Sequence, residues 1–168
     1  GAVSLCESAY VRPGTRLATP VSTLLGSLGL GVCYDLRFAE QSQALAAAGA
    51  QILTFPSAFT VNTGMAHWEP LLRARAIETQ CYVVAAAQTG RHNDKRSSYG
   101  HSMIVDPWGV VTAQCGEGVG VATANIDLSY LARVRSNMPV QSHRRPDLYG
   151  RVSLLQPGGR EGEWRLCV

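Results

Sequence analysis

The feature that most constrains the fold of this chain is an alternation of apolar runs and helix-forming residues in its first third. Residues 28–32 form a short apolar run containing glycine, which is typical of a buried strand. Residues 40–48 are rich in helix formers and stop at Gly49, a residue type that commonly follows a last helical turn. Residues 52–55 indicate the next strand, closed by Pro56. A strand, a helix and a strand in this order predict a sheet with parallel neighbours.

A second helix and strand follow the first unit. Residues 66–79 carry apolar side chains at spacings that share one helical face, namely Trp68, Leu71, Leu72 and Ala76. The apolar run 82–87 comes directly after them and predicts another strand.

From Ser102 onward the predicted elements become shorter. Strands are expected at 103–105 and 110–112, and the Pro and Gly of residues 106–109 predict a hairpin turn between them. Residues 119–126 indicate a further strand, and Asp127 is placed to cap a short helix. The sequence therefore predicts an α/β domain with a mixed sheet.

The composition and charge of the chain exclude several classes of protein. The hydrophobic fraction of 46% and the charged fraction of 16% are those of a globular protein. The net charge of +3 comes from scattered arginines and one lysine, so a solvated surface is favoured over nucleic-acid binding. The apolar stretches are too short to cross a bilayer, so no membrane association is expected.

The five cysteines stand at irregular spacing and their number is odd. This pattern favours neither a disulfide framework nor a zinc site. We therefore expect free thiols in a reducing compartment.

The turn at Cys33 is the most informative stretch. A strand that delivers a cysteine into a tight turn before a helix has the geometry of a nucleophile elbow, in which backbone N–H groups can bind an oxyanion. Gly31 is small enough to let the turn pack against the strand. From spacing alone, an inert buried thiol is an equally good interpretation of Cys33. The other four cysteines lack this context, and inert thiols are favoured for them.

A cysteine nucleophile needs a partner, and the residues leave two arrangements open. One is a Cys–His pair drawn from the four histidines, His67, His92, His101 and His143, none of which has a local signature. The other is a carboxylate base with a cationic stabiliser.

Five separated blocks resemble the nitrilase superfamily of carbon–nitrogen hydrolases. These blocks lie at residues 29–38, 55–59, 67–83, 99–109 and 144–149, and the likeness runs from about Leu5 to Gly150. The resemblance is to the amidase branch that acts on deaminated glutathione. It implies an αββα sandwich whose N-terminal part is missing here, and homo-oligomers that pair through helices.

The resemblance also implies the chemistry and the site. Cys33 would be the nucleophile that forms a thioester with a small, carboxylate-bearing amide. The backbone N–H of Tyr34 would bind the oxyanion, and Glu7 would assist as the family's second Glu. Arg37 and Trp68 are candidate substrate contacts. No metal or organic cofactor is implied, and a cytoplasmic location is expected, with mitochondria as a second location.

The family's general-base Glu and catalytic Lys have no counterpart here. The resemblance places both upstream of this segment, and Lys95 does not fit because it lies in the polar stretch 91–97, which we interpret as a loop. We therefore expect residues 1–150 to be the C-terminal portion of a hydrolase domain that is inactive alone. Residues 151–168 are expected to be an atypical tail outside the fold.

Two alternatives to the amidase function stay open. One is a non-catalytic isoform that acts through the helical dimer surface, and the other is the Cys–His thiol hydrolase. Two groups of charged residues are expected to be structural. Asp35, Arg37 and Glu40 can pair across a helix start, and Arg73, Arg75 and Glu78 can form an i,i+3 ion pair.

Overall fold

The computed structural model describes residues 11–149, which belong to two compact units. One unit is residues 18–143 and carries the fold discussed below. The described part of the other is residues 11–17 and 144–149, and it contains the short helix α4 (Pro146–Tyr149), where Arg145 Nε donates to Asp147 Oδ1 at 2.8 Å. Glu7 and the predicted tail 151–168 lie outside the described residues.

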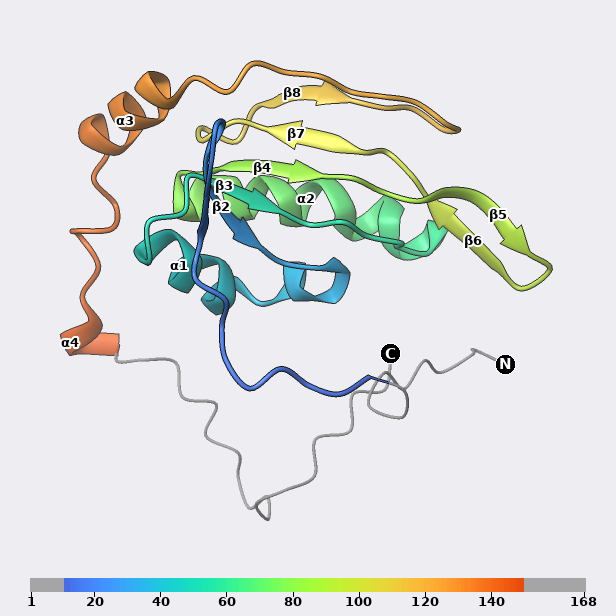
Figure 1. The fold of residues 1–168 in the computed structure, drawn as a ribbon, viewed down its shortest axis with the longest axis horizontal. Helices are drawn as coiled ribbons and strands as arrows, with labels where there is room; N and C mark the ends of the chain where they lie inside the picture. The colour runs from blue at the N-terminus through green and yellow to red at the C-terminus, as the bar shows by residue number, and fades with distance from the viewer. Residues whose placement is uncertain (1–10, 150–168) are drawn as a thin grey trace, which may run out of the picture. The chain divides into compact units, whose positions relative to one another are not determined.

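The larger unit is built on a six-stranded mixed sheet in the order β1-β2-β3-β4-β7-β8 (Figure 1). Its strands are β1 (Val21–Thr23), β2 (Gly26–Leu30), β3 (Ile52–Thr54), β4 (Tyr82–Ala85), β7 (Met103–Val105) and β8 (Val111–Gln114). Strands β2, β3 and β4 are parallel, and the outer pairs are antiparallel. The predicted strand–helix–strand unit and mixed sheet are confirmed.

The helices are α1 (Ala39–Ala47), α2 (Val61–Thr79) and α3 (Leu128–Asn137), with a 3-10 helix η2 (Cys33–Arg37) before α1. Gly49 follows α1 with φ +100°, as its predicted C-terminal position requires. The side chain of Asp127 accepts a 2.9 Å hydrogen bond from the N–H of Tyr130, which confirms it as the cap of α3.

Helix α2 begins at Val61, earlier than the predicted start at residue 66. The added turn contains Gly64, where a Cβ would lie 2.3 Å from the side chain of Tyr99. Close packing against Tyr99 therefore requires a glycine, and this residue type obscured the helical pattern in the sequence.

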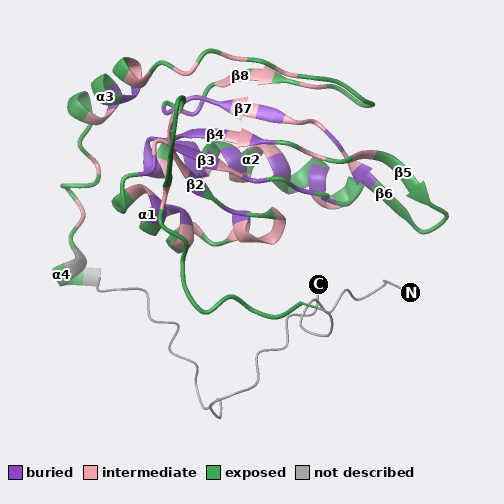
Figure 2. Ribbon diagram, viewed as in Figure 1, coloured by how far each residue is buried: buried purple, intermediate pink, exposed green. Residues whose placement is uncertain are grey.

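Helices α1 and α2 pack on one face of the sheet, and the main core lies between them and the strands (Figure 2). Leu53, Phe55 and Val83 point from the strands into this core, and Leu36 and Leu72 meet them from the helix side.

The other face of the sheet is less completely covered. Ile52, Tyr82 and Leu131 form a small cluster where α3 packs against this face. On the same face Leu30 is 47% exposed, so strand β2 is not buried on both sides as its apolar run predicted.

Two other predictions are wrong. Residues 91–97 are not a loop, because β5 (Thr89–Asn93) and β6 (Arg96–Tyr99) pair as an antiparallel hairpin. Residues 119–126 are extended, but no strand pairing reaches them within residues 11–149, and Val119 and Val121 are exposed. An alternating pattern makes a strand only where a neighbouring backbone supplies ladder hydrogen bonds.

The hairpin between β7 and β8 is confirmed. Asp106 Oδ1 accepts hydrogen bonds of 2.9 Å from the N–H groups of Trp108 and Val110, which closes the predicted turn.

Candidate active site

Cys33 lies beyond the carboxyl end of β2. Backbone hydrogen bonds between this segment and the segment after β3 continue past the ends of the two strands. The N–H of Gly31 donates to the carbonyl of Thr54 at 3.0 Å, and the N–H of Cys33 donates to the carbonyl of Pro56 at 2.9 Å. The chain then turns at once into η2. Ligand sites in parallel sheets lie at the carboxyl ends of strands, so the cysteine stands where such a site is expected.

The backbone of Cys33 is strained. Its φ of +46° lies in the left-handed region, which few residues other than glycine adopt. Such strain persists where the surroundings enforce it, and it is a property of nucleophile elbows.

Gly31 makes the close approach of the elbow possible. A Cβ at this position would lie 2.6 Å from Cε1 of Phe55, a core residue at the end of β3. The expectation that Gly31 allows the turn to pack against the strand is confirmed.

The start of η2 is closed by Asp35. Its Oδ2 accepts a 2.9 Å hydrogen bond from the N–H of Val32, and its own N–H donates to the carbonyl of Val32 at 2.9 Å. Within residues 11–149, no ion pair joins Asp35 to Arg37 or Glu40, so the predicted pairing across the helix start is wrong. Asp35 serves the backbone of the elbow instead.

Arg37 lies among aromatic rings beside the elbow. Its guanidinium carbon is 5.5 Å from the ring centre of Tyr34 and 5.6 Å from that of Phe59. Its Nη1 and Nη2 lie 3.3 and 3.4 Å from Nδ1 of His67. Because a guanidinium only donates, Nδ1 of His67 is the acceptor in this contact. Arg37 is half-buried, and it is the last residue of the short helix η2 that begins at Cys33.

Trp68 does not line a surface. It is 1% exposed, packs edge-on against Phe59 with ring centres 4.9 Å apart, and donates Nε1–H to the carbonyl of His101 at 2.7 Å. This burial favours a core role for Trp68 over the predicted substrate contact. The residue supports Phe59, which in turn contacts Arg37.

The histidines are engaged away from Cys33. Besides the contact of His67 with Arg37, His92 Nε2 bonds to Ser98 Oγ at 2.7 Å, and His101 Nδ1 bonds to the carbonyl of Tyr99 at 2.8 Å. No hydrogen bond joins Cys33 to a histidine in the described part of the chain, which is evidence against a Cys–His pair.

Cys33 differs from the other described cysteines in its surroundings. It is half-buried beyond the strand end, whereas Cys81, the residue before β4, is fully buried in the main core. Burial raises the pKa of the Cys81 thiol, although its hydrogen bond with Thr79 and the charge of Arg135, whose Nη2 is 3.1 Å from Sγ, oppose this. Cys81 is therefore protonated and inert at neutral pH, as predicted.

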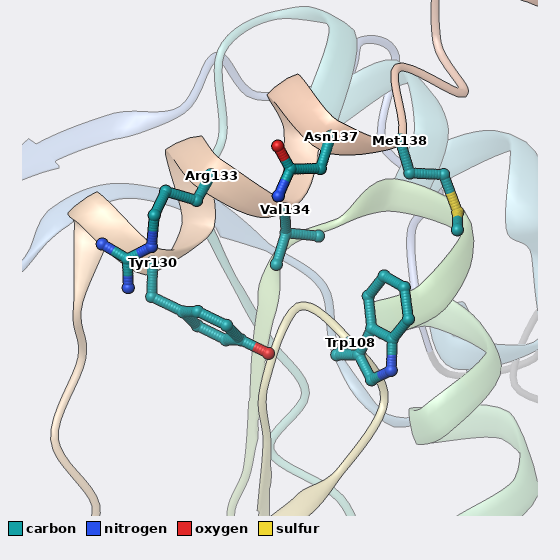
Figure 3. Close-up of a pocket in the computed structure, with 6 residues that line it drawn as sticks. All are labelled: Trp108, Tyr130, Arg133, Val134, Asn137 and Met138. Atoms are coloured by element: carbon teal, nitrogen blue, oxygen red, sulfur yellow. The ribbon is translucent and has the colours of Figure 1, made fainter.

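Cys33 does not line either of two hollows formed by described residues of the larger unit. One of about 300 Å³ lies between α3 and the β7–β8 turn (Figure 3). Its lining residues are Trp108, Tyr130, Arg133, Val134, Asn137 and Met138. The other, of about 510 Å³, opens beside the β5–β6 hairpin and includes Met65, Tyr99 and His101.

Sequence reasoning missed two partners of the elbow, Pro56 and His67. Pro56 was visible only as the end of a strand, and its role depends on the parallel register of β2 and β3. His67 carried no local signal, because its partner Arg37 is thirty residues away in the sequence.

Residues 11–149 contain no cluster of three or more His, Cys, Asp or Glu side chains arranged to bind a metal ion. None of the helices in this part of the chain combines the length and the apolar character needed to cross a bilayer.

The sequence profile of the carbon-nitrogen hydrolase family matches residues 2–136, and the chain belongs to this family. Human deaminated glutathione amidase is 66% identical over 148 residues, which are 88% of this chain and 45% of the human protein. The nitrilase-superfamily resemblance and the nitrilase-type α/β fold are thereby confirmed.

Solved structures agree with the sequence comparison. The crystal structure of the Caenorhabditis elegans NitFhit protein is 63% identical with a TM-score of 0.85, and the match covers 89% of this chain and 36% of that one. A mutant amidase from Nesterenkonia sp. AN1, which shows Michael addition of acrylamide at its active-site cysteine, is 30% identical with a TM-score of 0.65. That match covers 81% of this chain and 53% of the amidase. The chain spans about half the length of the curated relatives that it matches.

Proposed function

We propose that this chain carries the nucleophile of an amidase that cleaves the carbon–nitrogen bond of a small amide. The observation that supports this most is the left-handed backbone of Cys33 at the carboxyl end of a parallel strand. A strained cysteine at this place is expected of a nucleophile and serves no purpose for an inert thiol.

In the proposed reaction, Sγ of Cys33 attacks the amide carbonyl and forms a carbon–sulfur bond. The carbon–nitrogen bond then breaks, and the nitrogen of a primary amide takes up the proton that the thiol gave up and leaves as ammonia. Water attacks the resulting thioester, which releases the carboxylic acid and restores the thiol.

The oxyanion of the tetrahedral intermediate needs donors that are already in place. The N–H of Cys33 is used by the carbonyl of Pro56. The N–H of Tyr34, in the first turn of η2, is the donor that we assign to the oxyanion, because the first N–H groups of a helix lack partners within it.

We propose deaminated glutathione as the substrate, because human, bovine and murine relatives at 62–66% identity bear this activity in their names. The half-buried cation of Arg37, close to the elbow, suits a substrate that carries carboxylates.

Complete turnover needs more than these residues. Glu7 is proposed as the assisting carboxylate and stays a prediction, since it lies outside the described residues. The family's general base and catalytic lysine have no matching residues in this chain, so we propose that residues 1–168 alone bind or acylate but do not turn over. Losing one oxyanion donor typically costs about 10²–10³ in rate, and losing general acid–base catalysis about 10²–10⁴.

Ammonia release from deaminated glutathione tests the proposal. We expect no turnover by the 168-residue chain, and turnover by a version extended upstream with the family's missing segment. In the extended version Cys33→Ala should abolish activity, and Cys115→Ala should leave it unchanged. Full activity of the extended Cys33→Ala variant would refute the assignment.

We also propose that the chain self-associates through α2. Ile77 on this helix is 52% exposed, and it lies against Gly109 in the β7–β8 turn, whose neighbours Trp108 and Val110 are also exposed. An exposed apolar patch of this kind commonly marks a protein interface. Light scattering after gel filtration tests this: Ile77→Lys should lower the mass of the assembly, and the exposed but separate Val119→Lys should not. The non-catalytic isoform would use the same patch.

A further inference from the structure

The far end of η2 is held by a residue that the proposed mechanism does not use. Arg75, on α2, is 4% exposed. Its Nε donates to the carbonyl of Leu36 at 2.9 Å, and its Nη2 donates to the carbonyl of Arg37 at 3.1 Å. These are the last two residues of η2, whose carbonyls have no partner within the helix.

The third contact of Arg75 fixes its orientation. Nη1 donates to Oε2 of Glu78 at 3.0 Å, one turn further along α2. A buried cation is tolerated where it is paired and hydrogen-bonded, and Glu78 supplies the opposite charge. The planar guanidinium thus reaches two adjacent carbonyls and one carboxylate at once, which an ammonium on a flexible stem does not reproduce.

The two hydrogen bonds from Arg75 to the carbonyls of Leu36 and Arg37, called the clamp below, lie close to the cysteine because η2 spans only five residues. Its first residue is Cys33, whose φ of +46° is stable only if the chain is held on both sides. On the near side the N–H of Cys33 is held by Pro56. On the far side, Arg75 holds the turn through Leu36 and Arg37.

We infer that Arg75 is a positioning residue for Cys33. It acts through the backbone of η2 and keeps the thiol and the Tyr34 N–H in the geometry of attack. This inference rests on the proposed function of Cys33 as nucleophile. It predicts that loss of the clamp lowers the reactivity of Cys33 more than that of other thiols.

Helix α2 provides a matched control. Arg73 also donates Nε to a backbone carbonyl, that of Gly109 at 2.9 Å, and also pairs with a glutamate, Glu69, at 3.4 Å. Its target is the β7–β8 turn and not η2. Arg73→Leu therefore removes the same kinds of bonds from the same helix without releasing the elbow.

The experiment measures iodoacetamide labelling of the 168-residue chain by peptide mass spectrometry, with half-buried Cys115 as the internal reference. In the unsubstituted chain Cys33 should label faster than Cys115. Arg75→Leu should lower the Cys33 to Cys115 rate ratio about tenfold, since displacements near 1 Å at a reacting group cost up to about 10²-fold. Arg73→Leu should leave the ratio within about twofold.

The outcomes separate the two ideas. If Cys33 labels no faster than Cys115 in the unsubstituted chain, the proposed function fails. If Cys33 is the faster thiol but Arg75→Leu leaves the ratio unchanged or raises it, the positioning role is refuted while the proposed function stands.

Buried Cys81 reports on folding in the same samples, because it labels only when the core opens. If Arg75→Leu exposes Cys81, the Arg75→Lys variant tests the positioning role instead. It keeps the positive charge but loses the planar guanidinium that reaches two carbonyls at once. With Cys81 protected, Arg75→Lys should lower the ratio about threefold, and an unchanged ratio would refute the role. In an extended, active version, Arg75→Lys should lower kcat with little change in KM.

Discussion

The N–H of Cys33 donates to the carbonyl of Pro56 at 2.9 Å while Cys33 itself adopts φ +46°. The hydrogen bond joins the segments that directly follow the parallel strands β2 and β3, and it holds the cysteine backbone in a conformation that its side chain disfavours. The strained residue and the neighbouring strand end are therefore parts of one structure.

The first prediction concerns the strain at Cys33. Glycine adopts the left-handed region freely, whereas alanine keeps the penalty of a Cβ. Both substitutions remove the thiol, so their difference isolates the backbone. We expect Cys33→Gly to be more stable than Cys33→Ala by about 1 kcal/mol in the free energy of unfolding, measured with urea. Equal stabilities would show that the turn is not strained.

The second prediction concerns the approach of Gly31 to Phe55. Alanine here would place a Cβ 2.6 Å from the ring, so the aromatic side chain or the strand must move. We expect Gly31→Ala to cost about 1–3 kcal/mol of stability. Gly116→Ala is the control, because nothing lies within 4 Å of its Cβ and its φ is ordinary. Urea unfolding of both variants measures this difference. An equal shift of the unfolding midpoint in Gly31→Ala and Gly116→Ala would contradict the packing argument.

The third prediction distinguishes a core role from a substrate contact for Trp68. Replacement by phenylalanine removes the 2.7 Å hydrogen bond to the carbonyl of His101 and leaves a small cavity. We expect Trp68→Phe to lower stability by about 1–3 kcal/mol. Trp108→Phe, at a residue that is 52% exposed, should change it by less than about 0.5 kcal/mol. Thermal unfolding of both variants checks this. A midpoint temperature for Trp68→Phe equal to that of the unsubstituted chain would contradict the core role of Trp68.

The fourth prediction is a pH dependence. The folded state raises the pKa of the Cys81 thiol above its usual value of 9.0, chiefly by burial. Below pH 9.0 the thiol is protonated in both the folded and the unfolded chain, so its contribution to stability is fully present. Above that value the unfolded chain ionises first, and stability falls as pH rises toward the folded pKa.

Urea unfolding between pH 7 and about pH 10.5 measures this effect. Cys81→Ala should remove part of the loss of stability at alkaline pH, whereas Cys115→Ala should not. An identical pH profile for Cys81→Ala and the unsubstituted chain would mean that burial does not perturb this thiol.

Local signals explain what could be predicted from the sequence. The order of β2, α1 and β3, the end of α1 at Gly49, the turn at Asp106 and the cap at Asp127 all depend on residues within a few positions of one another. The elbow at Cys33 belongs to this class, since a strand, a tight turn and a helix follow in sequence. Family motifs added the assignment of the cysteine as nucleophile.

The errors came from residues whose structure depends on distant partners. Helix α2 starts early because Gly64 packs against Tyr99, and the polar residues 91–97 form a hairpin because two strands happen to pair there. Residues 119–126 have the hydrophobic pattern of a strand, but within residues 11–149 no neighbouring strand pairs with them.

The sequence by itself thus determined the parallel α/β unit and the place of the cysteine that we propose as the nucleophile, because backbone preferences and hydrophobic periodicity act over short ranges. Only the tertiary structure decided what contacts the backbone of that turn: Pro56, which follows β3, and Arg75 on α2, which is 39 residues from its partner Leu36. Such partners are determined by strand register and helix packing, and neither can be predicted from the spacing of residues along the sequence. For the same reason, the burial of Trp68 in the core and the hydrogen bond between Arg37 and His67 could not be predicted from the sequence.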